Sequence, residues 1–163
     1  MKKCWLVMCL MVTLTGCGAV ETFETMQDEY LQPVMGQMRQ INLTVPISAA
    51  APVMNDENGG RLYLCDGYVL TLQTLEGGDL DRTARAVSGF GCEKLSVVET
   101  AISGGKRFDW VWTAVGEGGD HIGRVAVLDD GTYHYCVSVM ADADTAGALE
   151  AEWSGLFSSV TLN

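Results

Sequence analysis

The sequence is poor in basic residues and in histidine. It holds 10 lysines and arginines against 21 acidic residues, for a formal net charge of -11. Because nucleic acid and anionic lipid headgroups are repelled by an acidic surface, we expect no nucleic-acid partner. Only His121 and His134 could act as histidine bases or ligands. With only two histidines, the sequence argues against a zinc site, which needs three or four ligands, and against Ser-His-acid catalysis.

The short motifs of common active sites are also absent. The chain has no Gly-x-Ser-x-Gly, no Gly-x-x-x-x-Gly-Lys and no Gly-x-Gly-x-x-Gly. The stretches "ENGG" (57–60) and "EGGD" (76–79 and 117–120) do not have the spacing of an EF-hand, and Gly-Gly pairs are typical of tight turns. We therefore expect no catalytic residue, no metal site and no cofactor, and a protein that is not an enzyme.

No hydrophobic run is long enough to cross a bilayer as a helix, which needs about 20 apolar residues. The uncharged run 4–12 is far shorter, and it follows Met1-Lys2-Lys3. A basic start followed by a short apolar run is typical of a secretory signal peptide. The stretch Leu14-Thr15-Gly16-Cys17 comes directly after it.

This last stretch resembles the lipobox of bacterial lipoproteins. The resemblance implies that residues 1–16 are a signal peptide cut before Cys17, and that the thiol of Cys17 carries diacylglycerol. Two acyl chains hold a protein stably on a membrane where one is marginal. We therefore expect a protein of the bacterial cell envelope, anchored to the membrane by lipid on Cys17 and facing outside the cytoplasm. The alternative is a plain exported protein with a chance cysteine.

The six cysteines do not form a large disulfide framework. Two lie in the signal, and Cys17 is consumed by lipid, so Cys65, Cys92 and Cys136 remain. An odd number allows at most one internal bridge. We favour Cys65 with Cys92 as a possible disulfide because both lie close to predicted strand ends. Free buried thiols are an equal alternative, since cysteine packs as a small hydrophobe.

The chain after the signal divides into two parts. Residues 17–40 are polar with scattered apolar positions and are interrupted by Pro33 and Gly36, which predicts a lipid anchor and tether. Residues 41–163 have the size and pattern of a single domain.

Alternation and turn residues predict the elements of this domain. Asp130-Gly131 predicts a hairpin turn. Asp79 and Gly89 predict the start and end of a helix. The predicted strands are 41–47, 61–75 as a hairpin, 94–102, 107–115, 121–128 and 132–140, and the predicted helices are 80–89 and 142–160. The fold class is α+β, a mainly antiparallel sheet built as a meander, with helices packed on its faces and a C-terminal helix that closes it.

Aromatic residues gather on one face of one predicted strand. Phe108, Trp110 and Trp112 alternate along it, and such a stripe is more often core beneath a helix than a binding platform. Trp153 of the closing helix is the expected packing partner. Exposure of Trp110 or Trp112 would instead indicate a surface for a ligand or partner.

The element order, together with the ending "AEWSGLFSSVTL" (151–162), resembles the PsbP/Mog1-like fold. The resemblance implies an N-terminal hairpin, a helix, a long antiparallel meander, and a C-terminal helix packed over the sheet. Members of that group are mostly interaction or assembly modules.

We therefore expect a membrane-anchored extracytoplasmic lipoprotein that acts as a non-enzymatic interaction or assembly module with an envelope protein partner. One alternative is a small-ligand-binding lipoprotein with a groove beside the sheet, which a pocket lined by Trp110 or Trp112 would favour. A hydrolase with scattered catalytic residues is the third hypothesis.

Overall fold

The computed structural model describes residues 37–49, 51–55, 60–116 and 118–163. The predicted signal peptide, the lipidation site Cys17 and most of the predicted tether lie outside the described residues. The chain from Gln37 to Asn163 forms one compact unit. None of the described helices is long and apolar enough to cross a membrane.

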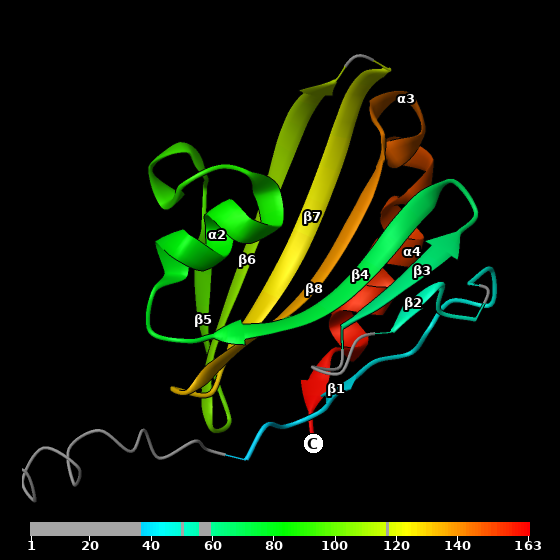
Figure 1. Ribbon diagram of the computed structural model, residues 1–163. Coiled ribbons are helices and arrows are strands. Elements are labelled where there is room, and N and C mark those ends of the chain that lie inside the picture. Colours follow the sequence, from blue (N-terminus) through cyan, green and yellow to red (C-terminus); the bar gives the residue numbers. More distant parts are fainter. Residues whose placement is uncertain (1–36, 50, 56–59, 117) are drawn as a thin grey trace, which may run out of the picture. The chain divides into compact units, whose positions relative to one another are not determined.

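A seven-stranded sheet is the framework of this unit, and every neighbouring pair in it is antiparallel. The strand order is β2-β3-β4-β8-β7-β6-β5 (Figure 1). Its strands are β2 (Met54–Asn55), β3 (Arg61–Cys65), β4 (Tyr68–Glu76), β5 (Val98–Ile102), β6 (Gly105–Gly116), β7 (Gly119–Asp129) and β8 (Tyr133–Asp142). The predicted hairpin is β3–β4 and the predicted meander is β5 to β8, so the predicted α+β class is confirmed.

One strand pair joins the hairpin to the meander. β4 pairs with β8 over its whole length, from Tyr68 opposite Ala141 to Glu76 opposite Tyr133. This pairing places β8 at the centre of the sheet. Because its residues alternate between the two faces, β8 contributes to the packing on both sides.

The helix α2 (Leu80–Ser88) has the predicted caps. The Asp79 carboxylate accepts a hydrogen bond from the Arg82 backbone N–H at 3.0 Å, which satisfies one of the free donors of the first turn. Gly89 ends the helix in the left-handed region at φ 79°, where its N–H donates to the Arg85 carbonyl. The 3-10 turn η1 (Cys92–Lys94) then leads to β5, so the predicted strand 94–102 begins only at Val98.

The C-terminal helix is broken into three parts: α3 (Ala143–Ala146), the 3-10 turn η2 (Gly147–Leu149) and α4 (Glu150–Ser159). The chain ends in the short strand β9 (Thr161–Leu162), which pairs with β1 (Ile41–Asn42). The predicted strand 41–47 is thus only two residues long. Beyond Asn42 the segment leaves its partner and turns at Pro46, whose carbonyl accepts from the Ala49 N–H.

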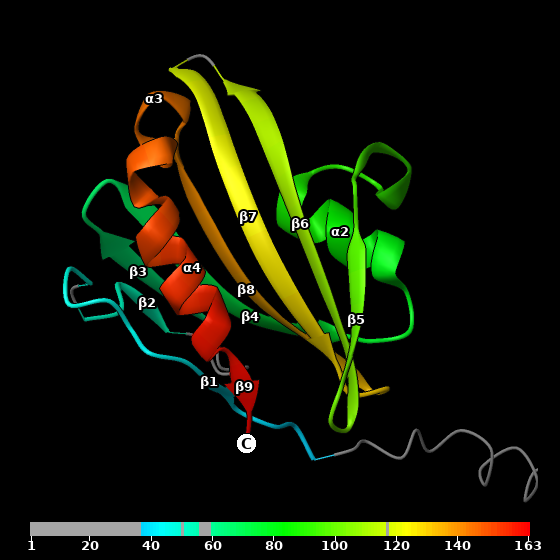
Figure 2. The ribbon, with the colours of Figure 1, turned by 180° about the vertical axis from the view of Figure 1, so that it is seen from behind.

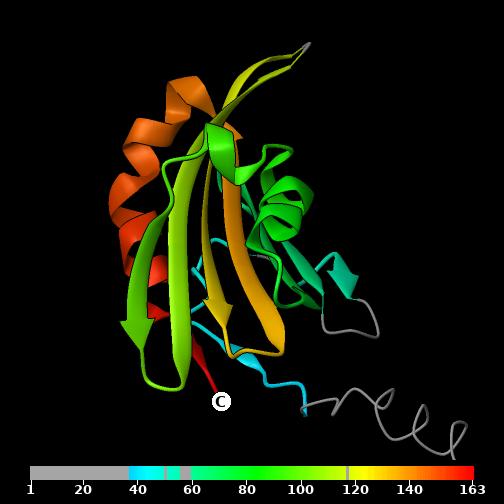
Figure 3. The ribbon, with the colours of Figure 1, turned by 90° about the vertical axis from the view of Figure 1, so that its left-hand side faces the viewer.

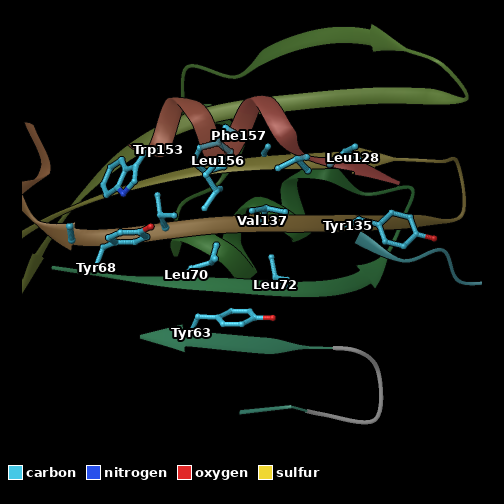
Figure 4. Close-up of a cluster of buried hydrophobic side chains, with 14 of the residues drawn as sticks. Tyr63, Tyr68, Leu70, Leu72, Leu128, Tyr135, Val137, Trp153, Leu156 and Phe157 are labelled. Carbon is cyan, nitrogen blue, oxygen red and sulfur yellow. The ribbon is translucent and has the colours of Figure 1, made fainter. Parts of the chain in front are cut away.

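The two faces of the sheet carry separate cores, with α4 on one side and α2 on the other (Figure 3). On the α4 side, Trp153, Leu156 and Phe157 pack over β4 and β8 (Figure 4). On the α2 side, Ala84 of the helix packs over a cluster from β6, β7 and β8 that consists of Phe108, Trp110, Trp112, Val125, Val127 and Cys136.

Each helix covers only half of its face. α2 packs over the β6–β7–β8 part of its face, where Thr83 contacts His134 of β8 and Leu75 at the end of β4 joins the same core. It leaves β2, β3 and the first part of β4 uncovered (Figure 1). α4 lies over β4, β8 and part of β7 on the other side, and the Arg107 side chain of β6 donates to the Phe157 carbonyl at its end. It leaves most of β5 and the far half of β6 uncovered (Figure 2). The two open halves therefore lie on opposite faces and at opposite edges of the sheet.

Candidate functional site

The tryptophans of β6 are core residues and do not form an exposed platform. Trp110 is 2 % exposed and Trp112 is 7 % exposed. Neither ring is exposed, because α2 packs over them, but Trp112 lines one cavity and Trp110 another, so a ligand or partner surface at these residues stays a prediction. The expected packing partner is wrong: Trp153 lies in the α4-side core, where its ring meets Tyr68 edge-on at 5.9 Å between centroids.

Trp112 has a special position at the border of the α2-side core. It is paired across the sheet with Gly123 of β7, and a Cβ added to Gly123 would overlap its six-membered ring. The indole therefore lies flat across β7. The next residue in that row is Met140 of β8, opposite Gly123. The glycine thus lets one edge of the ring reach the open half of the face.

A groove begins at this edge and runs over β8, β4 and β3 to β2. It consists of two cavities of about 200 and 440 Å³ that share Thr71 and Gln73. We call it the Trp112 groove. The side chains that line it on the α2 face are Met54, Leu62, Val69, Thr71, Gln73, Val87, Trp112, Ser138 and Met140. The larger of the two cavities has a size typical of small-ligand sites.

The larger cavity of the groove has a mainly apolar lining, and large apolar side chains are exposed at the mouth of the groove. Met54 is 64 % exposed and Met140 is 44 % exposed, and beside them Leu64 is 51 % exposed. Methionine is unbranched and adapts to the shape of what it contacts. A cluster of exposed apolar residues of this kind marks a binding surface more often than scattered single ones do.

Three polar side chains lie on the groove floor. Thr71 of β4 is directly opposite Ser138 of β8, and Gln73 follows two residues along β4 on the same face. All three are half-buried. Within the described residues, none of their side chains forms a hydrogen bond with the protein. Their hydrogen-bonding capacity is therefore left for water or a ligand.

Among the lining residues that the structure describes, the only charged one is Arg61. It is paired with Leu72, whose side chain belongs to the α4-side core, so the Arg61 side chain is directed to the opposite face. Apart from Arg61, the described lining of the groove is thus uncharged, on a strongly acidic protein. Sequence analysis missed it because Thr71, Gln73 and Ser138 have the pattern of ordinary solvent-facing strand residues.

His134 is buried between α2 and the sheet. Its Nδ1 lies 2.7 Å from the Thr83 hydroxyl, and its Nε2 lies 3.9 Å from an Asp129 carboxylate oxygen. Burial lowers the pKa of His134, and the carboxylates of Asp129, Asp79 and Asp130 offset this in part. Thr83 is 2 % exposed, so this hydroxyl is placed to hold α2 on the sheet and is inaccessible to a substrate.

His121, the other histidine, lies at the far end of β7. Its Nδ1 is 3.0 Å from an Asp142 carboxylate oxygen. No serine or threonine hydroxyl is recorded within hydrogen-bond distance of His121 among the described residues. In the same part of the chain, no group of three or more His, Cys, Asp or Glu side chains could hold a metal ion.

The predicted Cys65–Cys92 bridge is not formed. Cys65, Cys92 and Cys136 are all free thiols. Cys65 packs against the α4-side core and Cys92 against the α2-side core, so the sheet lies between them. Cys136 is fully buried, and burial raises the pKa of its thiol to about 12.

Comparisons with known proteins find a likeness in structure only. No protein-family model matches the chain, and no curated protein matches it in sequence. The fold is similar to the crystal structure of LpqN, which is involved in cell envelope biogenesis of Mycobacterium tuberculosis. The TM-score is 0.51 at 12 % sequence identity, over 77 % of this chain and 84 % of that one. The chain thus has an LpqN-like α+β fold, whereas the PsbP/Mog1 resemblance stays a prediction.

Proposed function

We propose that this protein is a lipid-anchored, non-enzymatic binding module of a bacterial cell envelope, and that the Trp112 groove is its binding site. The observation that carries the proposal is the floor of the groove, where Thr71, Gln73 and Ser138 offer uncommitted hydrogen-bonding groups between apolar walls. Apolar walls with a few convergent polar groups are the usual composition of a ligand site.

Two observations support the cell-envelope location that we propose. The lipobox-like stretch ending at Cys17 predicts export and a diacylglycerol anchor. The fold is like that of LpqN, a protein involved in cell envelope biogenesis. We extend the envelope role of that protein to this chain as part of the proposal.

The non-enzymatic part of the proposal is supported by the chemistry of the groove. Its described lining holds no histidine, no cysteine and no carboxylate. A general acid or base must lie within hydrogen-bond reach of the reacting group. The buried Thr83–His134 pair lies beneath α2, where a substrate has no access.

A second candidate, docking of an envelope protein partner, is favoured by the other open half of the sheet. There Val98 of the edge strand β5 is 61 % exposed, and Val111 and Val115, farther along β6, are 56 and 85 % exposed. An edge strand can pair with an extended segment of another chain. Cross-linking in intact cells tests this candidate, and cross-links that persist after Val98→Glu would exclude the β5 edge.

Native mass spectrometry of the membrane-extracted protein tests the binding module itself. We expect a bound small molecule that is retained by the unchanged protein and lost in Met140→Glu, which places a charge at the groove mouth. Val111→Glu is the matched control, because this residue is comparably exposed on the opposite face. Equal loss from both variants, or no bound molecule, would contradict the groove as the binding site.

A further inference from the structure

We infer that the ligand of the Trp112 groove is a neutral lipid with one acyl chain, joined to an uncharged polar group such as a glycerol ester. This inference rests on the proposed function and names the chemical class of its ligand. It follows from three features of the groove: its length and apolar walls, the short polar row on its floor, and the lack of charge.

The walls require a ligand that is mostly hydrocarbon. Leu62 and Met54 lie at the β2–β3 end of the groove, and Val87 and Trp112 lie at the other end. The groove crosses four neighbouring strands, β8 to β2. Neighbouring strands lie about 4.8 Å apart, so the floor is roughly 14 Å long. An extended acyl chain has this shape, whereas a compact sugar or amino acid leaves most of the walls uncovered.

The polar row requires hydrogen-bonding groups at one place along the ligand. Thr71 and Ser138 face each other, and Gln73 lies about 7 Å from Thr71 along the strand, the length of two residues. A pure hydrocarbon would cut these three side chains off from water without replacing the hydrogen bonds. Each lost bond of this kind costs about 1–3 kcal/mol. An ester carbonyl with a neighbouring hydroxyl supplies the missing partners.

The absence of charge excludes an anionic headgroup inside the groove. The described lining holds no lysine or histidine, and the Arg61 side chain is directed to the other face. A carboxylate or phosphate placed on the floor would be desolvated without a counter-ion, in a protein whose net charge is already -11. An acyl chain that carries an uncharged headgroup avoids this desolvation cost.

A peptide fits the groove less well than a lipid. Extended peptides bind sheets by adding a strand at an edge, where backbone groups are unpaired. Most of the groove floor is made of β3, β4 and β8, and each of these strands is already paired on both sides. The groove reaches the sheet edge only at β2, which is two residues long, so most of its floor offers side chains and no free backbone edge.

Quenching of tryptophan fluorescence by a brominated lipid tests the inference. The probe is the monoacylglycerol of 9,10-dibromostearic acid, and the protein is the full mature chain with Cys17→Ala, made without lipid so that its own acyl chains do not compete. We expect saturable quenching that is lost in Trp112→Phe, because Trp112 lines the groove whereas Trp110 and Trp153 do not. The free brominated acid should bind at least tenfold more weakly at neutral pH.

Two sets of variants locate the binding. Thr71→Val with Ser138→Ala should weaken binding of the monoacylglycerol about tenfold and remove its preference over the free acid. Met140→Glu should abolish quenching, while Val111→Glu on the opposite face should leave it unchanged. Far-ultraviolet circular dichroism of each variant shows that its fold is retained. Quenching that is unsaturable, equal for acid and ester, or unaffected by Met140→Glu would overturn the inference.

The inference and the proposed function fail in different ways. If the native protein carries a small molecule that Met140→Glu releases, but the brominated monoacylglycerol does not quench, the lipid assignment is overturned and the binding module stands. A peptide found in that position would also overturn the lipid assignment. If no molecule is bound at all and no quenching occurs, the lipid assignment and the binding module are both contradicted.

Discussion

At the scale of single residues, the burial of each cysteine determines how its thiol reacts. Cys65 and Cys92 are partly exposed and Cys136 is completely buried. Because the thiolate is the reactive form, a thiol whose pKa is raised to about 12 in the core reacts very slowly at neutral pH.

We therefore predict that iodoacetamide alkylates Cys65 and Cys92 in the folded protein and reaches Cys136 only after unfolding. Peptide mapping by mass spectrometry measures this. Protection of Cys65 and Cys92 together, relieved by a reducing agent, would instead reveal the bridge that the structure lacks.

The buried His134 makes stability depend on pH. Its pKa is lowered from 6.5 by burial, so the unfolded chain binds a proton at a higher pH than the folded protein does. The stability is therefore complete above about pH 6.5 and falls as the pH drops toward the folded pKa, by at most about 1.4 kcal/mol per pH unit. Thr83, Asp79, Asp129 and Asp130 surround the ring.

Urea unfolding at pH 7.5, 6.5 and 5.5 measures this loss. His134→Gln keeps a hydrogen-bonding partner for Thr83 and does not titrate, so we predict a flatter profile for this variant. Parallel profiles for the two proteins would show that other groups cause the acid sensitivity.

At the scale of single elements, the fit between β6 and β7 depends on Gly123. A Cβ there would collide with the Trp112 ring, and overpacking of this kind costs about 1–3 kcal/mol. We predict that Gly123→Ala destabilises the protein by that amount and that Trp112→Leu in the same chain recovers part of it. A double-mutant cycle in urea isolates the coupling of the two residues.

Gly155→Ala is the control for this measurement. Gly155 lies inside α4 with no atom near the position of a new Cβ. Alanine there should stabilise the helix by about 0.5–1 kcal/mol. Destabilisation by both substitutions would show that steric collision with Trp112 is not the cause at Gly123.

The elements that sequence reasoning predicted are those with local signals. Asp79 and Gly89 marked both ends of α2, and Asp130-Gly131 marked the β7–β8 turn. The pairing of β4 with β8 has no local signal, because its ladder joins residues as far apart in the chain as Tyr68 and Ala141. The face on which Trp153 packs was also missed, since an amphipathic stripe does not say which side of a sheet it covers.

The groove was beyond sequence reasoning for a related reason. Thr71, Gln73 and Ser138 are polar residues on an alternating strand, a pattern that normally indicates contact with water. They become a site because α2 ends beside them: Ala86 and Val87 of the helix line the same cavity and do not close it. The extent of coverage by a helix is a property of tertiary packing and is not encoded in any one segment.

For the whole molecule, the first prediction concerns the anchor. We predict that the intact mass of the membrane-extracted protein corresponds to a chain that begins at Cys17 and carries diacylglycerol. Cys17→Ala should be uncut or released from the membrane. An unlipidated mature chain would contradict the anchored part of the proposed function and would leave the groove unaffected.

The way the chain enters the folded unit has a mechanical consequence. The Arg39 N–H donates to the Tyr135 hydroxyl at 2.9 Å, and the Arg39 side chain donates to the Leu162 carbonyl at 3.2 Å, beside the two-residue β1–β9 pair. A pulling force applied ahead of Gln37 therefore acts first on these few hydrogen bonds. These hydrogen bonds can break one after another while the long β4–β8 and β6–β7 pairs remain intact. The entry segment therefore detaches under force before the sheet and its groove are deformed.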